Sequence, residues 1–347
     1  MKVAVLGSGS WGTALSKVLV DNGHETMLWG IEAEVIQEIN DHHTNHKYLK
    51  EAQLPAKLKA SLSLEECCQT AELILLVLPT KAIRSVCDQL TPILSSMNHP
   101  PLIVHATKGI ELETELRISQ VIEACLSADA YQDIVVLSGP SHAEEVAVED
   151  LTTITAASKN PEAARRVQEV FMNDYFRVYT NRDIVGVELG GALKNIIALA
   201  AGILAGLGYG DNAKAALITR GLAEMTRLGV KLGADPLTFS GLSGVGDLIV
   251  TCTSVHSRNW QAGKLFAQGY NLDQVVDRVQ MIVEGITTTQ VAYQLAREYQ
   301  VEMPITQAVY QLVYQDAPLR EGIVNLMTRE GKSEASLEQH LEETEEK

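Results

Sequence analysis

The sequence lacks the cysteine patterns of metal-binding and disulfide-rich proteins. It has five cysteines in 347 residues, and two of them, Cys67 and Cys68, are adjacent rather than spaced as Cys-x-x-Cys. An odd number of cysteines without ligand-like spacing is typical of reduced thiols in the cytoplasm. We therefore expect no metal site and a cytoplasmic location.

The sequence also lacks a long apolar run. The nearest candidate, residues 196–207, is shorter than the roughly 18–20 apolar residues that cross a bilayer, and Lys194 and Asp211 bound it. A buried helix is the better interpretation, and we expect no membrane insertion. The N-terminus leads directly into a predicted strand, so we expect no signal peptide.

Positive charge is scarce, because 28 Lys and Arg face 44 Asp and Glu and leave a net charge of −16. This balance argues against nucleic acid as a partner, since nucleic acids select for basic surfaces. It also repels phosphorylated ligands at long range. An anion site therefore has to be built locally, from helix N-termini and a few basic side chains.

The first half of the chain alternates short apolar segments with amphipathic ones, which predicts a sheet covered by helices on both faces. We expect the first strands to be parallel and the last few to be parallel or mixed. The expected strands are Lys2–Leu6, Thr26–Trp29, Leu73–Leu78, Leu102–Ala106, Ile134–Leu137, Thr152–Ala156 and Arg177–Tyr179. The expected helices include Thr13–Asn22, Ile83–Leu94, Thr114–Ser127 and Pro161–Asn173.

From about Asp183 the apolar residues recur mainly with the spacing typical of helices, and no convincing strand follows. The expected helices are Val187–Leu207, Asn212–Leu232, Arg258–Gln268, Leu272–Asp277, Thr288–Tyr299 and Pro304–Tyr314. A chain of this length favours two domains. We assign residues 1–182 to an α/β domain, residues 183–330 to an all-α domain and residues 331–347 to an acidic tail. An apolar helical domain also favours a homodimer.

A glycine motif follows the first strand and opens the first helix. In VAVLGSGSWGTAL, Gly7 permits a tight turn, Gly9 lets a pyrophosphate approach the backbone, and Gly12 lets helix and strand pack closely. The amides near Ser10 and Trp11 would then face the phosphates. In this context the motif predicts a dinucleotide site, although a merely tight turn would give the same pattern.

The residue after the second strand usually meets the adenosine ribose in such folds. Here the segment is Trp29-Gly30-Ile31-Glu32, and Glu32 could bind a ribose 2′-hydroxyl or simply start a helix. Residues 42–59 form a polar loop that is long enough to suspect a role over the cofactor. Its lysines could supply charge for a 2′-phosphate, but their spacing does not indicate which one: Lys47, Lys50, Lys57 or Lys59.

Two glycine-containing polar segments follow strands of the α/β half, where open sheets bind ligands. The first, Ala106-Thr107-Lys108-Gly109, offers Lys108 as a functional cation or as a surface lysine. The second, residues 138–143, offers amides and hydroxyls to a ligand. Its Ser141 could alternatively cap the next helix with Glu144 in a capping box.

Two further segments belong to the helical half. Lys194 lies in GGALKN, and a lysine within an apolar helix is costly unless it is paired or employed. Because burial lowers its pKa, Lys194 suits general acid–base work, the alternative being a snorkelling lysine. Asp247, in GLSGVGDL, could orient Lys194 or cap the following helix.

The segment Ser257-Arg258-Asn259 precedes or opens a helix and combines a hydroxyl, a guanidinium and an amide. With free helix amides these groups make a good phosphate site, although Arg258 could instead form a surface ion pair. Three histidines lie close to these segments in the sequence: His105, His142 and His256. They do not form a metal-ligand pattern, and we expect structural or supporting roles for them.

The chain resembles NAD(P)-dependent glycerol-3-phosphate dehydrogenase, closest to the bacterial biosynthetic form. The resemblance spans roughly Met1 to Tyr314. It is carried, in order, by the segments GSGSWGTAL, ATKG, SGPSHAEEV, GVELGGALKNIIALAAGI, NAKAALITRGLAEM, GLSGVGDLIVTCTSVHSRN, VEG and VEMPIT. It implies a Rossmann-type domain followed by an all-α domain like that of 6-phosphogluconate dehydrogenase. The implied reaction is the reversible reduction of dihydroxyacetone phosphate to sn-glycerol 3-phosphate, which feeds glycerophospholipid synthesis.

The resemblance also implies roles for individual positions. The lysine matching Lys194 is the proton acceptor, and we assign supporting catalytic roles to Asp247 and Lys108. Implied substrate contacts are Lys108, Gly139, Ser141, Lys194, Asp247, Ser257, Arg258 and Asn259. Expected cofactor contacts, from the motif and the resemblance together, are Gly7, Gly9, Ser10, Trp11, Gly12, Lys108, Ala143, Arg258, Ile282 and Glu284.

One position departs from the family pattern. Bacterial members usually carry Arg or His near position 31, which can meet the 2′-phosphate of NADPH, whereas this chain has Ile31 followed by Glu32. The expected cofactor is therefore NAD(H), NADP(H) or both. Two other hypotheses stay open at this point: a dehydrogenase of the same plan acting on a 3-hydroxyacyl-CoA or ketopantoate, and a nucleotide-sensing regulator without turnover.

Overall fold

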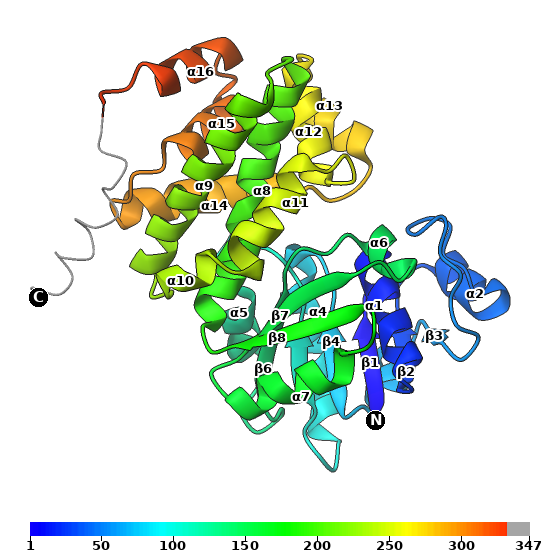
Figure 1. Ribbon diagram of the computed structural model, residues 1–347. Helices are drawn as coiled ribbons and strands as arrows, with labels where there is room; N and C mark the ends of the chain where they lie inside the picture. The colour runs from blue at the N-terminus through cyan, green and yellow to red at the C-terminus, as the bar shows by residue number, and fades with distance from the viewer. Residues whose placement is uncertain (332–347) are drawn as a thin grey trace, which may run out of the picture.

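The computed structural model describes residues 1–331, which form an α/β part and a helical part (Figure 1). Eight strands form one sheet in the order β3-β2-β1-β4-β5-β6-β7-β8. Neighbouring strands are parallel, except that β6 and β7 are antiparallel. The strands are β1 (Lys2–Leu6), β2 (Glu25–Trp29), β3 (Lys59–Ser61), β4 (Leu73–Leu76), β5 (Leu102–His105), β6 (Ile134–Ser138), β7 (Thr152–Ala157) and β8 (Phe176–Asn181).

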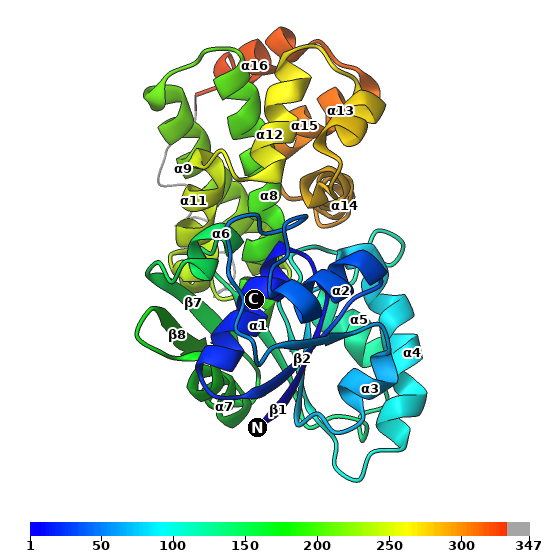
Figure 2. The same ribbon diagram turned by 90° about the vertical axis from the view of Figure 1, so that its right-hand side faces the viewer.

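Helices lie on both faces of this sheet, as Figure 2 shows. They are α1 (Ser10–Asp21), α2 (Ala33–His42), α3 (Leu64–Cys68), η1 (Thr80–Ala82), α4 (Ile83–Ser95), α5 (Ile118–Cys125), α6 (Ala143–Ala147) and α7 (Pro161–Phe171). Successive side chains of β1 alternate between two apolar cores: Val3 and Val5 join the core under α1 and α7, and Ala4 and Leu6 join the core under α4 and α5. The near-continuous apolar strands of the sequence are therefore explained by burial on both faces.

The helical part follows β8. It comprises α8 (Ile184–Gly206), α9 (Asp211–Lys231), α10 (Pro236–Phe239), η2 (Leu242–Gly246), α11 (Asp247–Thr253), α12 (Arg258–Ala267), α13 (Leu272–Val279), α14 (Glu284–Glu298), α15 (Pro304–Gln315) and α16 (Leu319–Met327). No strand occurs between residues 183 and 331. A third apolar core surrounds α8, against which α9, α11, α12 and α14 pack. The predicted succession of a Rossmann-type sheet and an all-α region is confirmed.

Helix α8 is longer than the apolar run seen in the sequence. Its 23 residues are long and apolar enough to cross a membrane by length and composition, but 83% of its most apolar window is buried inside the protein. The expectation that no segment reaches that length is corrected, because the helix continues N-terminally through small and apolar residues around Lys194. The expectation of a buried helix agrees with its surroundings.

Several element boundaries differ from those expected. Helix α5 begins at Ile118 rather than Thr114, because Ile110 and Arg117 form an isolated bridge that keeps the preceding segment out of the helix. Helix α14 begins at Glu284 rather than Thr288. The three-residue strand β3 was not expected from the sequence, whereas α2 begins directly after Glu32, for which a helix start was one of the two interpretations. Apart from Gly331, the expected acidic tail lies outside the described residues.

The segment VEMPIT starts α15 and receives its cap from another helix. Pro304 is in the first turn of α15, where its missing N–H costs nothing. The buried carboxylate of Glu224 on α9 accepts hydrogen bonds from the amides of Ile305 (2.6 Å) and Thr306 (3.1 Å). The hydroxyl of Thr306 adds a third bond at 3.0 Å. This contact fixes α9 against the N-terminus of α15.

Two glycines let α8 and α12 cross with their backbones in contact. A Cβ added to Gly202 would lie 2.0 Å from the carbonyl oxygen of Trp260, and one added to Gly263 would lie 2.0 Å from that of Leu199. Real Cβ atoms do not approach backbone so closely, so a side chain at either position forces the helices apart. The crossing therefore requires glycine on both helices.

We expect Gly263→Ala to lower the free energy of unfolding by about 1–3 kcal/mol, the usual cost of overpacking. Chemical denaturation followed by circular dichroism measures this. Gly322→Ala on α16 is the matched control, since a Cβ there meets nothing within 4 Å, and alanine gains up to about 1 kcal/mol of helix propensity. Equal stability of the two variants would contradict the close crossing.

Candidate active site

The glycine loop between β1 and α1 has the geometry of a dinucleotide site. Gly7 has a φ of +128°, and an added Cβ would lie 2.2 Å from the carbonyl oxygen of Val77. A Cβ on Gly12 would lie 1.8 Å from the carbonyl oxygen of Gly7. Gly9, in contrast, has open space around it and caps α1 without a side-chain hydrogen bond. The N-terminus of α1 is thus left to a ligand, and the loop fits a pyrophosphate.

The residues beside the glycine loop fit the same interpretation. The indole Nε1 of Trp11 is buried and has no hydrogen-bond partner among the described residues. Ala143 is the first residue of α6, which packs against α1. Trp11 thus offers a donor without a partner among the described residues, and Ala143 lies on the helix that packs against α1.

Glu32 follows β2 and is the N-cap residue of α2, but its side chain makes no capping hydrogen bond. Its carboxylate instead accepts hydrogen bonds from Lys47 and from the hydroxyl of Tyr48, the latter at 2.6 Å. These two bonds, Lys47 first, hold the pKa of Glu32 below its usual value. The loop from residue 43 to residue 58, predicted to be polar, is anchored by three buried leucines: Leu49, Leu54 and Leu58.

Three segments distant in sequence meet at the carboxylate of Asp247. Lys194 on α8 donates to Oδ1, and Lys108, after β5, lies 2.7 Å from Oδ2. Lys194 also donates to the Oγ1 of Thr251 at 2.8 Å. Lys194 is only 5% exposed and Asp247 1%. The ammonium of Lys194 therefore ends inside the protein on fixed partners, so the alternative of a snorkelling lysine is wrong.

The charges of this cluster shift one another's protonation. Burial lowers the pKa of Lys194 most strongly; the Asp247 carboxylate opposes this, and the Lys108 ammonium adds to the lowering. The net pKa of Lys194 lies well below its usual value. Burial raises the pKa of Asp247, but the ammonium groups of Lys108 and Lys194 outweigh it and hold the pKa below the usual range. The cluster thus keeps Asp247 ionised beside a lysine that can exchange a proton.

The glycines of GGALKN explain why α8 can bring Lys194 to this place. A Cβ on Gly190 would lie 2.5 Å from the carbonyl oxygen of Ser243, in the turn that leads to Asp247. A Cβ on Gly191 would lie 2.9 Å from the hydroxyl of Ser138, at the end of β6. Both glycines face neighbours that carry site residues, so the absence of side chains sets how closely those neighbours approach.

Gly139 and Ser141 border the same cluster. Gly139 has a φ of +153°, and its carbonyl oxygen accepts hydrogen bonds from Lys108 (3.1 Å) and from the hydroxyl of Ser141 (3.0 Å). His142, not Ser141, is the N-cap of α6, and it makes no side-chain cap bond. The alternative that Ser141 and Glu144 form a capping box is therefore wrong. The ring of His142 lies 5.9 Å from that of His256.

The segment Ser257-Arg258-Asn259 lies at the N-terminus of α12. Ser257 caps the helix by accepting the amide of Trp260 at 3.2 Å. The buried side chain of Asn259 donates to Asn195 of α8 and accepts from the amide of Gly285, both at 2.9 Å. Arg258 is exposed and donates to the carbonyl oxygen of Ile282 at 3.2 Å. Asn259 thus joins three helices, while Arg258 remains available to an anion.

Glu284 ties the start of α14 to the sheet. Its carboxylate accepts hydrogen bonds from the amide (3.0 Å) and hydroxyl (2.9 Å) of Thr80, which follows β4. Burial raises the pKa of Glu284, and the bonds from Thr80 partly oppose this. Ile282, two residues before Glu284, accepts from Arg258. The structure therefore brings together three positions for which the resemblance implies cofactor contacts: Arg258, Ile282 and Glu284.

His105 takes part in a buried contact behind the cluster. Its Nε2 lies 3.1 Å from Oε1 of Glu188 on α8, a carboxylate that also accepts the amide and hydroxyl of Ser119, each at 2.7 Å. Arg117 completes the group with a short contact to the same carboxylate. The bonds from Ser119 and Arg117 hold the start of α8 against α5.

Sequence reasoning missed two residues of the site. Thr251 lies four residues after Asp247 on α11, so both face the same side, and this spacing could have revealed it. Thr80 carries no comparable signal, because its partner Glu284 is 204 positions away.

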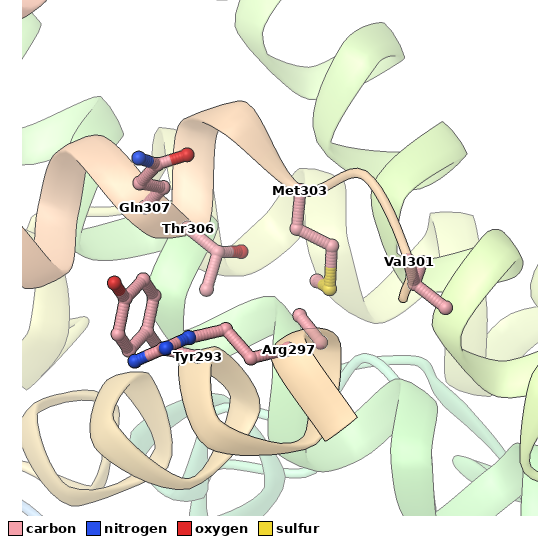
Figure 3. Close-up of a pocket in the computed structure, with 7 residues that line it drawn as sticks. Tyr293, Arg297, Val301, Met303, Thr306 and Gln307 are labelled. Carbon is pink, nitrogen blue, oxygen red and sulfur yellow. The ribbon is translucent and has the colours of Figure 1, made fainter. Parts of the chain in front are cut away.

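A small cavity among the described residues lies apart from the charged cluster. The cavity between α14 and α15, of about 70 Å³, is lined by Tyr293, Ala296, Arg297, Val301, Met303, Thr306 and Gln307 (Figure 3). None of Lys108, Lys194 and Asp247 lines it. Within residues 1–331, no group of three His, Cys, Asp or Glu side chains is placed to hold a metal ion.

Comparison with known proteins identifies the family. The profile of the NAD-dependent glycerol-3-phosphate dehydrogenase N-terminus matches residues 2–164, and the profile of the C-terminus matches residues 183–324. Glycerol-3-phosphate dehydrogenase [NAD(P)+] of Enterococcus faecalis is 58% identical over 333 residues, which cover 96% of this chain and 97% of that one. Its counterpart in Streptococcus sanguinis is 57% identical over the same shares.

A solved structure agrees with these matches. The crystal structure of glycerol-3-phosphate dehydrogenase from Coxiella burnetii superposes with a TM-score of 0.88 at 35% identity, covering 94% of this chain and 98% of that one. The resemblance, enzyme class and NAD(P) cofactor expected from the sequence are thereby confirmed. The chain belongs to the NAD-dependent glycerol-3-phosphate dehydrogenase family.

Proposed function

We propose that the cluster of Lys194, Asp247 and Lys108 carries out proton transfer in the reversible reduction of dihydroxyacetone phosphate to sn-glycerol 3-phosphate. The observation that carries this proposal is the buried ion pair of Lys194 with Asp247 at the carboxyl end of β5, beside the Lys108 ammonium. When bound, the reduced nicotinamide supplies a hydride to the substrate carbonyl carbon. Lys194 supplies the proton that the carbonyl oxygen then needs.

Each residue of the cluster has a distinct task. Asp247 orients the Lys194 ammonium through Oδ1 and offsets part of its desolvation. Lys108 holds the other oxygen of Asp247 and the carbonyl oxygen of Gly139, so it keeps a second positive charge beside the reacting oxygen. Thr251 accepts a hydrogen bond from Lys194 and so restricts the rotation of the Lys194 ammonium group. Such fixed geometry is what makes proton transfer efficient.

The substrate phosphate binds at the start of α12 in this proposal. Arg258 supplies a guanidinium that can form two parallel bonds to a phosphate, and Ser257 places the first turn of the helix beside it. The contribution of Asn259 is to hold α8, α12 and α14 together at this point. The phosphate anchor then orients the carbonyl of a small substrate toward Lys194.

The remaining assignments extend the proposal. Residues 1–182 form the cofactor domain, residues 183–330 the substrate domain, and residues 331–347 an acidic tail. The enzyme acts in the cytoplasm as a homodimer without membrane insertion, and its product feeds glycerophospholipid synthesis. The buried environment of α8 supports a packing role for the most apolar helix.

The function is tested by initial-rate oxidation of NADH and of NADPH with dihydroxyacetone phosphate, using dihydroxyacetone as the control substrate. We expect turnover that requires the phosphate.

Arg258→Ala should raise the KM for dihydroxyacetone phosphate at least tenfold, the usual scale for a lost charge-assisted bond, with a smaller effect on kcat. An unchanged KM would remove Arg258 from the phosphate site. Comparable turnover of dihydroxyacetone would show that no phosphate anchor operates at α12.

Lys194→Ala should lower kcat by about 10²–10⁴-fold, because the substrate oxygen loses its proton donor. Lys194→Met, which keeps the apolar stem, should behave alike if the ammonium is the active group. Titration of NADH fluorescence checks that both variants still bind cofactor. Lys214→Ala on α9 is the control, since that lysine pairs only with Asp211 among the described residues. A near-normal kcat in either Lys194 variant would refute the role.

Lys108→Met should shift the pH dependence of the reduction to higher pH. In this direction Lys194 must be protonated, so kcat/KM falls as pH rises through the pKa of Lys194. Because the Lys108 ammonium lowers that pKa, its removal raises the pKa and moves the alkaline limb upward. The pH profile of kcat/KM measures the midpoint independently of any loss in absolute rate. A midpoint that stays in place would show that another group controls the limb.

A further inference from the structure

The adenosine end of the cofactor site contains an ion pair whose cation was not identifiable from sequence. Lys47 donates to the carboxylate of Glu32, and the Lys47 and Glu32 side chains are 56% and 34% exposed. Tyr48 donates its hydroxyl to the other oxygen of Glu32 at 2.6 Å. Glu32 stands directly after β2, where the adenosine ribose is bound in this type of fold. The pair is therefore exposed at the place where NADH and NADPH differ.

The backbone of this loop is fixed to the glycine loop. The hydroxyl of Ser10 donates to the carbonyl oxygen of Tyr48 at 2.7 Å. The buried side chain of Asn45 donates to the carbonyl oxygen of Ser8 at 3.0 Å and to the hydroxyl of Thr13 at 2.9 Å. Lys47 thus has a flexible, half-exposed side chain on a backbone that is held against the phosphate-binding turn.

Of the residues next to Glu32 and Tyr48, Lys47 is the one that can supply a positive charge beside Glu32. Ile31 is 80% exposed and carries no charge. His46, beside Lys47 in sequence, pairs with Glu38 of α2 at 2.5 Å. Among the described residues, Lys47 is the only cation that pairs with Glu32. In a chain of net charge −16, a bound dianion needs such a local positive group.

We propose that Lys47 is the residue that accepts the 2′-phosphate of NADP(H), and that Glu32 and the phosphate compete for it. With NAD(H), the ribose hydroxyl donates to Glu32, which keeps its bonds to Lys47 and Tyr48. With NADP(H), Lys47 and the Tyr48 hydroxyl donate to the phosphate instead, since both are donors that serve a carboxylate and a phosphate equally well. The exchange lets one site take either cofactor.

Lys47→Met tests the assignment, with Lys50→Met as the matched control. Lys50 lies in the same loop, is exposed and has no bonded partner among residues 1–331, so its loss changes the net charge equally without removing the donor. We expect Lys47→Met to lower kcat/KM for NADPH about tenfold or more, the scale of a lost charge-assisted bond. The value for NADH should change less than about threefold, and Lys50→Met should leave both nearly unchanged.

A binding measurement separates this inference from the proposed reaction on which it rests. Calorimetry with adenosine 2′,5′-bisphosphate and with adenosine 5′-monophosphate needs no turnover. Lys47→Met should weaken only the bisphosphate, and Glu32→Gln should strengthen it because the competing carboxylate charge is gone. That pattern supports the role of Lys47 even if dihydroxyacetone phosphate is not reduced. Equal losses for both nucleotides, or equal effects of Lys47→Met and Lys50→Met, would overturn it.

Discussion

The buried carboxylate of Asp247 is the constraint on which the site depends. It takes one ammonium on each oxygen, from Lys194 on α8 and from Lys108 after β5. An unpaired charge at this depth would be costly, and two lysines without the carboxylate would repel each other. The three groups therefore have to arrive together, and their backbones must approach closely. The glycines at positions 190 and 191 provide that approach, since both would clash if they carried a Cβ.

The second requirement is that the helical part keeps a fixed position on the sheet. Polar contacts at two separate places between the helical part and the α/β part fix this position. Glu188 is held by Ser119 near the start of α8, and Glu284 is held by Thr80 at the start of α14. Both carboxylates receive backbone amides from the α/β part, so they combine a hydrogen bond with a specific direction. As a result, Lys194 of the helical part and Lys108 of the α/β part can both reach the carboxylate of Asp247.

Features that leave a pattern within a short stretch of sequence were predictable, whereas contacts between distant positions were not. Strands and long helices have a period, and the glycine motif and Lys194 stand out locally, so the fold class and the central lysine were predictable from short segments. The bonds between Glu284 and Thr80 and between Asn259 and Gly285 join distant positions without any pattern. The short strand β3 was missed for a related reason: a strand of three residues owes its existence to pairing with β2.

The electrostatic design reconciles an acidic chain with anionic ligands. Each basic residue of the site is held near a carboxylate or a carbonyl oxygen: Lys194 and Lys108 at Asp247, Arg258 at Ile282 and Lys47 at Glu32. The depth of each pair decides what it can do. In the buried pair at Asp247, low dielectric makes the charges interact strongly, so protonation is tuned and the partners stay fixed. In the exposed contacts of Arg258 and Lys47, water weakens the existing bond, and an incoming phosphate can compete for the same donors. In the proposed mechanism, burial thus distinguishes the cations of the proton-transfer cluster from the cations that bind a phosphate.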